Sequence, residues 1–332
     1  MTILITGGTG FVGSHVATRL RASGHVVRLL ARDPAKVARV PALRETVDLE
    51  VVQGDVTDRA SVERALEGCT AVVHAAAHVS LAERDAARAE AVNVGGTRLV
   101  VDAAIKRGLK AVYVSSVSVF GIGHDRITLD TPLAEGGGSY TRSKVAAERI
   151  VRELQDGGAP ISIVYPSAVL GPEIPDLGGS VQGLLFWIKT PPRTSTGASI
   201  VDVRDVALAI ELALDAPAAR WMLGGTFVTY PEMRAAIARV TGVERAAIPM
   251  PGWLLRVAGR CGDLVKRVVP FDFPLTYEAM SMATRAAPYD SAATQRDLGM
   301  EWRPVDDTLA DSIRWLAGHG DLSDREAGRL AT

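Results

Sequence analysis

Thr6-Gly7-Gly8-Thr9-Gly10-Phe11-Val12-Gly13 is the stretch that decides the fold of this 332-residue chain. The short β-branched run Thr2–Thr6 precedes it, and an apolar helical pattern follows it. Glycines at this spacing, between a strand and a helix, are typical of a turn that holds a dinucleotide pyrophosphate at the helix N-terminus. Gly7 would allow the tight turn, Gly10 the close approach to the pyrophosphate, and Gly13 the packing of helix on strand. The simpler alternative is a glycine turn that binds no ligand.

The first half of the chain alternates short patterns of buried strands with amphipathic helical patterns. The predicted strands are Thr2–Thr6, His25–Leu30, Leu49–Gln53, Ala71–His74, Ala111–Ser115 and Ile161–Tyr165. The predicted helices lie near Val12–Ser23, Pro34–Val40, Arg59–Glu67, Ala82–Arg107 and Tyr140–Gln155. This alternation predicts an α/β protein with a doubly wound parallel sheet, the Rossmann fold, covered by helices on both faces.

The pattern loosens after Pro166 into Gly- and Pro-rich loops interleaved with helices, which indicates a smaller C-terminal substrate-capping region. The segment from Ser199 to Ala209 reads as a strand and then a helix, so we expect the chain to return to the main sheet there. We therefore assign residues 1–165, with about 199–216, to a dinucleotide-binding domain. Residues 166–198 and 217–332 form the expected substrate-binding region.

The composition excludes several classes of function. A formal net charge of -1, with 47% hydrophobic and 23% charged residues, gives no electrostatic reason to expect nucleic acid or an anionic membrane as a partner. No apolar run approaches the ~20 residues needed to span a bilayer. Cys69 and Cys261 are too few for a disulfide framework and suit a reducing compartment. We expect a cytoplasmic protein, without a metal site, that acts on a small molecule.

The second strand bears on the choice of cofactor. It ends in Ala31-Arg32-Asp33, with alanine where NAD-type sites usually carry an acid that binds the ribose 2′-hydroxyl. The planar fork of Arg32 could hold a 2′-phosphate, and Lys36 lies one turn away. NADP(H) is therefore favoured and NAD(H) remains possible. In the alternative interpretation, Arg32 is a solvated charge and Asp33 caps the next helix.

Two further strand ends are predicted to meet the cofactor, because ligands of open α/β sheets bind outside the carboxyl ends of the strands. Asp55 and Val56 follow the third strand and are placed to touch the adenine. Ala75, Ala76 and Ala77 follow the fourth strand and would let the cofactor pass without steric conflict. His74 and His78 flank this path, and we assign neither a role beyond packing or capping.

A serine cluster ends the fifth strand in Val114-Ser115-Ser116-Val117-Ser118. We assign Ser116 to hydrogen-bond and polarise a substrate carbonyl oxygen. Ser115 and Ser118 are alternatives for this role, and serines at strand ends are also common as caps.

Tyr140 and Lys144 stand four residues apart, which places a phenol and an ammonium on one helical face. A neighbouring cation lowers the tyrosine pKa towards the range of a general acid or base. Tyr140 would donate a proton to the substrate oxygen, or remove it in the oxidative direction, and Lys144 would also hold the nicotinamide ribose. Asn93 could support Lys144 through a water or backbone contact, or only satisfy backbone groups in its own helix.

These residues resemble the extended short-chain dehydrogenase/reductase family, of the NAD-dependent epimerase/dehydratase type. The resemblance runs from Thr6 to about Trp315. Its motifs are Thr6–Gly13, Gly54–Val56, the Asn93 segment, Ser115–Gly121, Tyr140-x-x-x-Lys144, Tyr165–Pro172, Ile200–Ala207 and Tyr289–Trp302. It implies that the backbone from Pro166 to Val169 lines the nicotinamide pocket. The full predicted cofactor set is Gly7, Thr9, Gly10, Phe11, Val12, Gly13, Arg32, Lys36, Asp55, Val56, Ala75, Ala76, Ala77, Ser115, Tyr140, Lys144, Pro166, Ser167, Ala168 and Val169; the catalytic set is Ser116, Tyr140, Lys144 and Asn93.

The second strand most resembles those of dihydroflavonol reductase-like and hydroxysteroid dehydrogenase-like members, which implies an NADP(H)-dependent oxidoreductase for a ketone or aldehyde on a small, rather hydrophobic molecule. Nucleotide-sugar epimerases usually carry Asn and Arg where this chain has Ser167 and Ala198, although Arg193 could compensate. The alternatives are an epimerase or dehydratase with tightly bound NAD, and a redox-sensing module that binds NADP without catalysis. The resemblance also implies a homodimer in which the helices Ala82–Arg107 and Tyr140–Gln155 pair, although their alanine-rich faces equally suit packing on the sheet.

Overall fold

A parallel sheet lies at the centre of the computed structural model, which describes residues 1–332 except 81–82, 195, 250, 266–276 and 332. Within the described residues it has seven strands in the order β10-β6-β5-β4-β1-β2-β3. They are β1 (Thr2–Thr6), β2 (Val26–Ala31), β3 (Glu50–Gln53), β4 (Ala71–His74), β5 (Lys110–Val114), β6 (Ile161–Pro166) and β10 (Arg220–Leu223). Every neighbouring pair in it is parallel. This order reverses direction between β1 and β4, as in doubly wound dinucleotide-binding sheets, and it confirms the predicted fold class.

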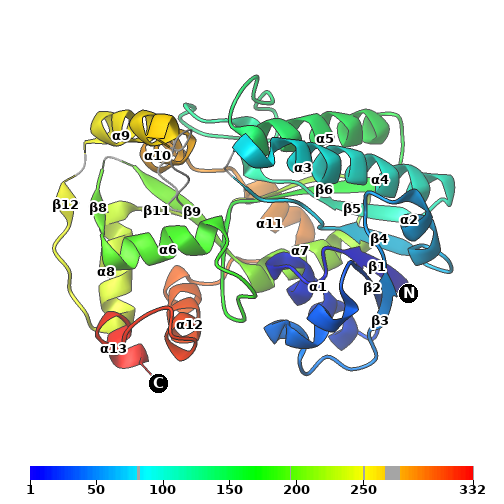
Figure 1. The fold of residues 1–332 in the computed structure, drawn as a ribbon, viewed down its shortest axis with the longest axis horizontal. Helices are drawn as coiled ribbons and strands as arrows, with labels where there is room; N and C mark the ends of the chain where they lie inside the picture. The colour runs from blue at the N-terminus through cyan, green and yellow to red at the C-terminus, as the bar shows by residue number, and fades with distance from the viewer. Residues whose placement is uncertain (81–82, 195, 250, 266–276, 332) are drawn as a thin grey trace.

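Helices cover both faces of this sheet (Figure 1). On one face lie α1 (Phe11–Ala22) and α7 (Val203–Asp215), and on the other lie α2 (Arg59–Ala65), α4 (Thr97–Lys106) and α5 (Ser139–Asp156). Side chains of β1 alternate between the two cores: Ile3 and Ile5 belong to the first, and Leu4 to the second. Because both of their faces are buried, the inner strands read as continuous apolar runs, which is why the sequence predicted them closely.

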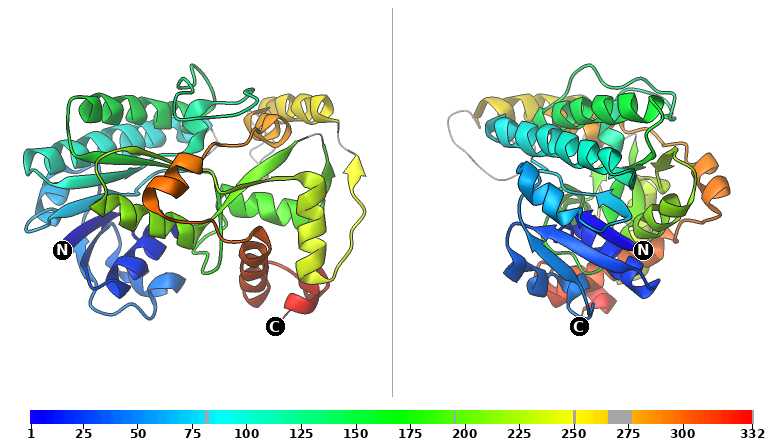
Figure 2. Two further views of the ribbon diagram at one scale, coloured as in Figure 1. Left: turned by 180° about the vertical axis from the view of Figure 1, so that it is seen from behind. Right: turned by 90° about the vertical axis from the view of Figure 1, so that its right-hand side faces the viewer.

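A second, smaller layer stands beyond the carboxyl ends of the main strands (Figures 1 and 2). Its sheet has the order β11-β9-β7, formed by β7 (Ala168–Leu170), β9 (Gly197–Asp202) and β11 (Thr226–Thr229). A third apolar core joins this sheet to α6 (Gly179–Lys189), α8 (Tyr230–Thr241) and α12 (Val305–Gly318). The region also contains the pair β8 (Pro192–Arg193) and β12 (Ile248–Pro249), and the helices α9 (Gly252–Val265), α10 (Tyr277–Arg285) and α13 (Asp324–Ala327), whereas α11 (Ala292–Leu298) packs on α7 and β10 of the main layer. This is the smaller C-terminal region that the sequence predicted.

One strand belongs to a different sheet from the one expected. The segment beginning at Ser199 does form a strand and then a helix, but β9 pairs with β7 and β11 instead of joining the main sheet. The chain returns to the main layer through α7 and then β10, which pairs with β6. A strand pattern records burial and alternation, whereas sheet membership depends on which edge is available, so the prediction for this strand was wrong.

The long helix predicted at Ala82–Arg107 is interrupted. The described part contains the 3-10 turn η3 (Glu83–Asp85), α3 (Ala86–Ala89), the π-helical segment η4 (Glu90–Gly96) and α4; Ala82 lies outside the described residues. Gly96 packs so closely on Val56 that a Cβ there would lie 2.9 Å from the valine Cγ2. Similarly, Pro34–Val40 forms a 3-10 helix, η1 (Pro34–Arg39), instead of an α-helix.

The packing of α1 on the first turn can be tested with a pair of glycine variants. A Cβ on Gly13 would lie 2.2 Å from the carbonyl oxygen of Gly7, whereas a Cβ on Gly95 meets nothing within 4 Å. We expect Gly13→Ala to lower the free energy of unfolding by about 1–3 kcal/mol, because backbone atoms must move to relieve the overlap. Gly95→Ala should be neutral or stabilising by up to about 1 kcal/mol. Urea unfolding of both variants measures this, and equal stability of the two would contradict the packing argument.

Candidate active site

The glycine turn brings β1, α1 and the end of β4 into direct contact. Gly7 has a φ of +74°, and a Cβ on it would lie 2.6 Å from the backbone of Ala75 and Ala76. Helix α1 begins after Gly10, which offers no side-chain cap to the first turn. The first N–H groups of a helix lack partners within the helix, and the helix dipole favours an anion there. The turn therefore fits a dinucleotide pyrophosphate, with Thr9, Phe11 and Val12 half-buried around it.

The end of β2 presents two basic side chains to solvent. Arg32 and Lys36 are both exposed, and among the described residues neither makes a side-chain hydrogen bond or ion pair. Asp33 caps η1, because its Oδ1 accepts a hydrogen bond from the N–H of Ala35 at 3.0 Å. The capping alternative for Asp33 is thus correct in geometry, and it leaves the guanidinium of Arg32 available to a ligand.

The end of β3 holds its turn with its own carboxylate. Oδ1 of Asp55 accepts hydrogen bonds from the N–H and the hydroxyl of Thr57, each at 2.9 Å. Val56 is buried and packs on Gly96 of η4. The third strand end is therefore joined to the segment that carries Asn93, beside the residues that follow β4.

The three serines after β5 differ in what their hydroxyl groups do. Ser115 is buried and donates to Oε2 of Glu148 at 2.7 Å. Oγ of Ser116 accepts a hydrogen bond from the N–H of Ser118 at 3.2 Å, while Oγ of Ser118 is a buried atom with no partner among the described residues. Ser115 is thus committed to the protein, whereas Ser116 has a fixed oxygen and a hydroxyl proton that is free to point at a ligand.

Lys144 is a buried cation beneath these serines, with 2% of its surface exposed. Its ammonium donates to the phenol oxygen of Tyr113 at 3.1 Å and to the carbonyl of Val114 at 2.9 Å. Loss of hydration lowers the pKa of Lys144 to about 8, although the negative charge of Glu148 partly offsets this by raising it. Because an ammonium has three donors, one N–H remains for a ligand.

Glu148 lies one turn beyond Lys144 on α5 and is fully buried. It accepts hydrogen bonds from Ser115, from the hydroxyl of Tyr165 at 2.5 Å and from Nε of Arg152 at 2.7 Å. The guanidinium of Arg152 also lies over the rings of Phe120 and Tyr165. Burial and the Glu148 carboxylate raise the pKa of Tyr165, so it stays a phenol. This cluster fixes α5 to the ends of β5 and β6.

Tyr140 stands in the first turn of α5, half-buried and one turn before Lys144. Glu83 holds this helix end, because its carboxylate accepts from the N–H of Ser139 at 3.0 Å and pairs with Arg142 at 2.8 Å. An acid at a helix N-terminus is favoured by the helix dipole. The position of Tyr140 is therefore set by the η3 turn as well as by its own helix.

Asn93 links the exit of β4 to the same helix turn. Its amide accepts from the N–H of His78 at 2.7 Å, donates to the His78 carbonyl at 3.1 Å and donates to Oγ of Ser143 at 2.9 Å. Ser143 in turn donates to the carbonyl of Tyr140 at 2.8 Å. Asn93 sits in the π-helical segment η4, and such segments are frequent at functional sites.

The end of β6 completes this edge of the sheet. Pro166 ends β6, and the half-buried Ala168 and Val169 begin β7. Ser167 links the two strands. Ser167 donates its N–H to the Leu223 carbonyl at 3.1 Å and its hydroxyl to the Gly224 carbonyl at 2.9 Å. Its polar groups therefore bind the exit of β10.

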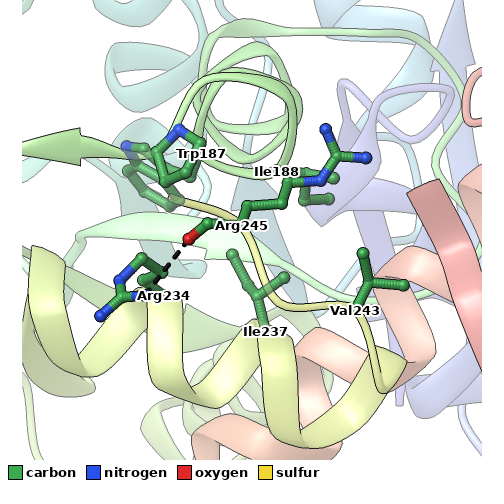
Figure 3. A pocket seen from close by; sticks show the side chains of 7 residues that line it. Trp187, Ile188, Arg234, Ile237, Val243 and Arg245 are labelled. Carbon is green, nitrogen blue, oxygen red and sulfur yellow. Dashed lines mark hydrogen bonds between the residues drawn. The ribbon is translucent and has the colours of Figure 1, made fainter. Parts of the chain in front are cut away.

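A small pocket in the C-terminal layer stands apart from these residues. It is lined by Trp187, Ile188, Pro191, Arg234, Ile237, Val243 and Arg245, and Arg234 donates to the Arg245 carbonyl at 3.2 Å (Figure 3). Its cavity volume is about 10 Å³, which leaves room for no more than one water molecule. No substrate fits there.

Sequence reasoning missed two residues of the constellation, Tyr113 and Glu148. Glu148 follows Lys144 by four residues, so the helical period already placed both on one face. Tyr113 lies in a continuous apolar run in β5, a pattern that signals burial but does not identify the partner of its hydroxyl. His74 was noted without a role, and it bonds Thr6 at 2.7 Å and Thr97 at 2.9 Å.

The described part of the chain shows neither a cluster of metal ligands nor a membrane-spanning helix. No cluster of three or more His, Cys, Asp or Glu side chains there could hold a metal ion. Cys69 and Cys261 are both free thiols. No helix in the described ranges is long and apolar enough to cross a bilayer.

Comparison with known proteins finds relatives along the whole chain. Residues 3–222 match the model of the NAD dependent epimerase/dehydratase family. The chain is 29% identical to a Synechocystis sp. protein named "Putative dihydroflavonol 4-reductase", over 95% of this chain and 94% of that protein. It is 32% identical to Cinnamoyl-CoA reductase 1 of Oryza sativa subsp. japonica, over 96% of this chain and 91% of that one. The crystal structure of gox2253 superimposes with a TM-score of 0.80 at 30% identity, covering 97% of this chain and 99% of that chain.

The buried charge of Lys144 predicts a pH-dependent stability. Between its folded pKa of about 8 and its ordinary value of 10.5, the unfolded chain carries a proton on Lys144 that the folded chain has released. Stability should therefore rise with pH across this window. We expect the free energy of unfolding of the wild type, relative to Lys144→Met, to rise by on the order of 2 kcal/mol from pH 8 to pH 10. Chemical denaturation measures this difference. Lys106→Met, at an exposed position, is the control, and a difference that does not change with pH would refute the prediction.

Proposed function

The chain belongs to the NAD dependent epimerase/dehydratase family of extended short-chain dehydrogenase/reductase enzymes, and we propose that it interconverts a ketone or aldehyde with an alcohol using NADP(H). An NAD(P) cofactor is typical of this family. The observation that supports the proposal is the buried ammonium of Lys144, which bonds the Val114 carbonyl two residues before Ser116 and lies one helical turn after Tyr140.

Each of these residues has a role that its surroundings support. A bound nicotinamide supplies or accepts the hydride. Ser116 keeps its oxygen fixed by the Ser118 N–H and donates a hydrogen bond from its hydroxyl to the substrate oxygen, which polarises the carbonyl without transfer of the serine proton. Tyr140 gives a proton to that oxygen during reduction and takes it back during oxidation. Lys144 lowers the pKa of Tyr140 through its charge and binds the nicotinamide ribose with its remaining N–H. Asn93, through Ser143, holds the helix turn that carries Tyr140.

The preference for NADP(H) rests on the end of β2. Ala31 is buried and apolar where an acid would bind the ribose hydroxyl, and Arg32 and Lys36 are exposed on either side of the Asp33 cap. A guanidinium without a protein partner suits a phosphate, because its fork matches two phosphate oxygens.

A small, rather hydrophobic carbonyl compound is the proposed substrate. The relatives named "Putative dihydroflavonol 4-reductase" and "Cinnamoyl-CoA reductase 1" support a reductase that acts on a carbonyl group. The hydroxyl of Ser167 is bonded to the Gly224 carbonyl at the end of β10. Ala198 in β9 has no polar side chain that could bind a nucleotide diphosphate. The second candidate, a nucleotide-sugar epimerase with tightly bound NAD, is favoured by the family description alone and would need no added cofactor.

Two finer expectations, a homodimer and a cytoplasmic location, stay predictions. For the dimer, α4 and α5 pack side by side on one face of the sheet (Figure 2). Sedimentation of the purified chain measures its oligomeric state directly.

Replacing the proposed acid tests the mechanism. Tyr140→Phe should lower kcat for carbonyl reduction by at least about 100-fold, because the proton donor is lost. The Kd for NADPH should remain close to that of the wild type. Tyr230→Phe, which removes a buried hydroxyl bonded to the Ala283 carbonyl, serves as the matched control and should keep its activity. Retained turnover in Tyr140→Phe would exclude this role.

Replacing the proposed phosphate ligand tests the cofactor. Arg32→Ala should weaken NADPH binding by about 10- to 100-fold, the loss expected for charge-assisted hydrogen bonds, and leave NADH binding unchanged. Arg39→Ala, at the exposed last residue of η1, is the control. Fluorescence titration measures both cofactors. Equal weakening of NADH and NADPH would remove the case for a 2′-phosphate site, and copurified NAD with a nucleotide sugar would favour the epimerase.

A further inference from the structure

A run of buried polar side chains crosses the main sheet beneath the candidate site. Thr6 of β1 bonds Nδ1 of His74 at 2.7 Å, and Nε2 of His74 bonds Thr97 of α4 at 2.9 Å. Thr97 interacts with the hydroxyl of Tyr113 on β5, whose oxygen accepts from the ammonium of Lys144 at 3.1 Å. The run therefore begins at Thr6, just before the glycine turn, and ends at Lys144 of α5.

The ring of Tyr113 is held on two sides. His74 stacks on it with a centroid distance of 5.8 Å and an interplanar angle of 22°. Nζ of Lys144 lies 4.6 Å from the ring centroid in addition to its contact with the hydroxyl. A buried ring with one stacked neighbour and one cation beside it has little freedom to rotate, so its hydroxyl is a fixed acceptor.

We propose that Tyr113 is a positioning residue for Lys144, held in register by Thr97 and His74. The reason for positioning Lys144, to bind the cofactor, rests on the proposed function. The contacts between Tyr113 and Lys144 do not depend on that function. Tyr113 and the Val114 carbonyl fix two of the three N–H groups of the ammonium, which leaves the third for a ligand.

The run positions Lys144 and does not carry protons to solvent. Thr6, His74, Thr97 and Tyr113 are each no more than 1% exposed, so it has no outlet to water. Burial lowers the pKa of His74 to about 3 and raises that of Tyr113 well above its usual value. Both groups therefore stay neutral at any pH at which the protein would work.

The remaining charges around Lys144 are few. The titratable groups that face it are His74 from β4, Tyr113 from β5, and Tyr140 and Glu148 from its own helix, with Tyr165 of β6 behind Glu148. The oxygens of Glu148 bond to Ser115, Tyr165 and Arg152 instead of to Lys144. Among the described side chains, Tyr113 is thus the direct acceptor for this buried ammonium.

The test measures the titration of Lys144 itself in the purified full-length chain. The chain has six lysines, so [ε-13C]lysine labelling gives a simple NMR spectrum, and Lys144→Arg assigns the signal. Tyr113→Phe removes one oxygen atom. It should lower the pKa of Lys144 by about one unit, because the ammonium loses a hydrogen-bond acceptor. Tyr230→Phe is the matched control and should leave that pKa unchanged.

A second variant keeps the inference testable if Tyr113→Phe does not fold. Thr97→Val retains the Tyr113 hydroxyl but removes the Thr97 hydroxyl that contacts it. It should therefore lower the pKa of Lys144 as well, by a smaller amount than Tyr113→Phe. A Lys144 pKa that is unchanged in the folded variants would overturn the positioning role.

The pH dependence of NADPH affinity separates this inference from the proposed function. If Lys144 binds the cofactor as its ammonium, affinity should fall with rising pH at a pH that is about one unit lower in Tyr113→Phe. A shifted NMR titration in a protein that turns over no nicotinamide substrate would support the positioning role and refute the proposed function. Turnover together with a Lys144 pKa that is unchanged in Tyr113→Phe would support the proposed function and refute the positioning role.

Discussion

The burial of two opposite charges on one face of α5 is the constraint on which the candidate site depends. Lys144 and Glu148 are both almost completely removed from water, yet they do not form a direct ion pair. Removing a charge from water costs several kcal/mol unless hydrogen bonds replace the lost hydration. The chain supplies these bonds from the ends of β5 and β6: Tyr113 and Val114 for the lysine, and Ser115 and Tyr165 for the glutamate. The helix is thereby fixed at the edge of the sheet where ligands of this fold bind.

The same edge is held from the other side by close backbone contacts. Gly7 and Gly13 leave no space for a side chain, so the first turn, α1 and the exit of β4 touch directly. The turn leaves the N-terminus of α1 without a side-chain cap, which suits an anion. Thr6 belongs both to this turn and to the buried polar run that reaches Lys144. The proposed pyrophosphate and ribose sites are therefore joined by one continuous set of buried contacts.

The second layer has a different character from the first. Its three-stranded sheet and the helices α6, α8 and α12 share a core of their own, and it joins the main layer through β6–β7 and β9–α7. Asp202, at the end of β9, is fully buried and bonds Arg204 and Thr308, which ties α12 to the start of α7. The candidate site therefore lies on the first layer, and the second layer adds a separate apolar core beyond it.

The sequence by itself determined what is local. Strand and helix patterns placed β1 to β6, α1 and α5 to within one or two residues, because a fully buried strand and an amphipathic helix each have a distinctive period. The glycine spacing predicted the turn at Thr6–Gly13, and the spacing of Tyr140 and Lys144 placed them on one helical face. Only the tertiary structure decided the long-range partners: Tyr113 for Lys144, Ser115 for Glu148 and Ser143 for Asn93. It also decided that β10, and not β9, is the strand that joins the main sheet after β6, and that a π-helical segment interrupts the long helix at Glu90–Gly96. The physical reason is that periodicity records which side chains are buried, whereas the atom that a buried polar group meets is set by strand register and helix packing across 30 or more residues.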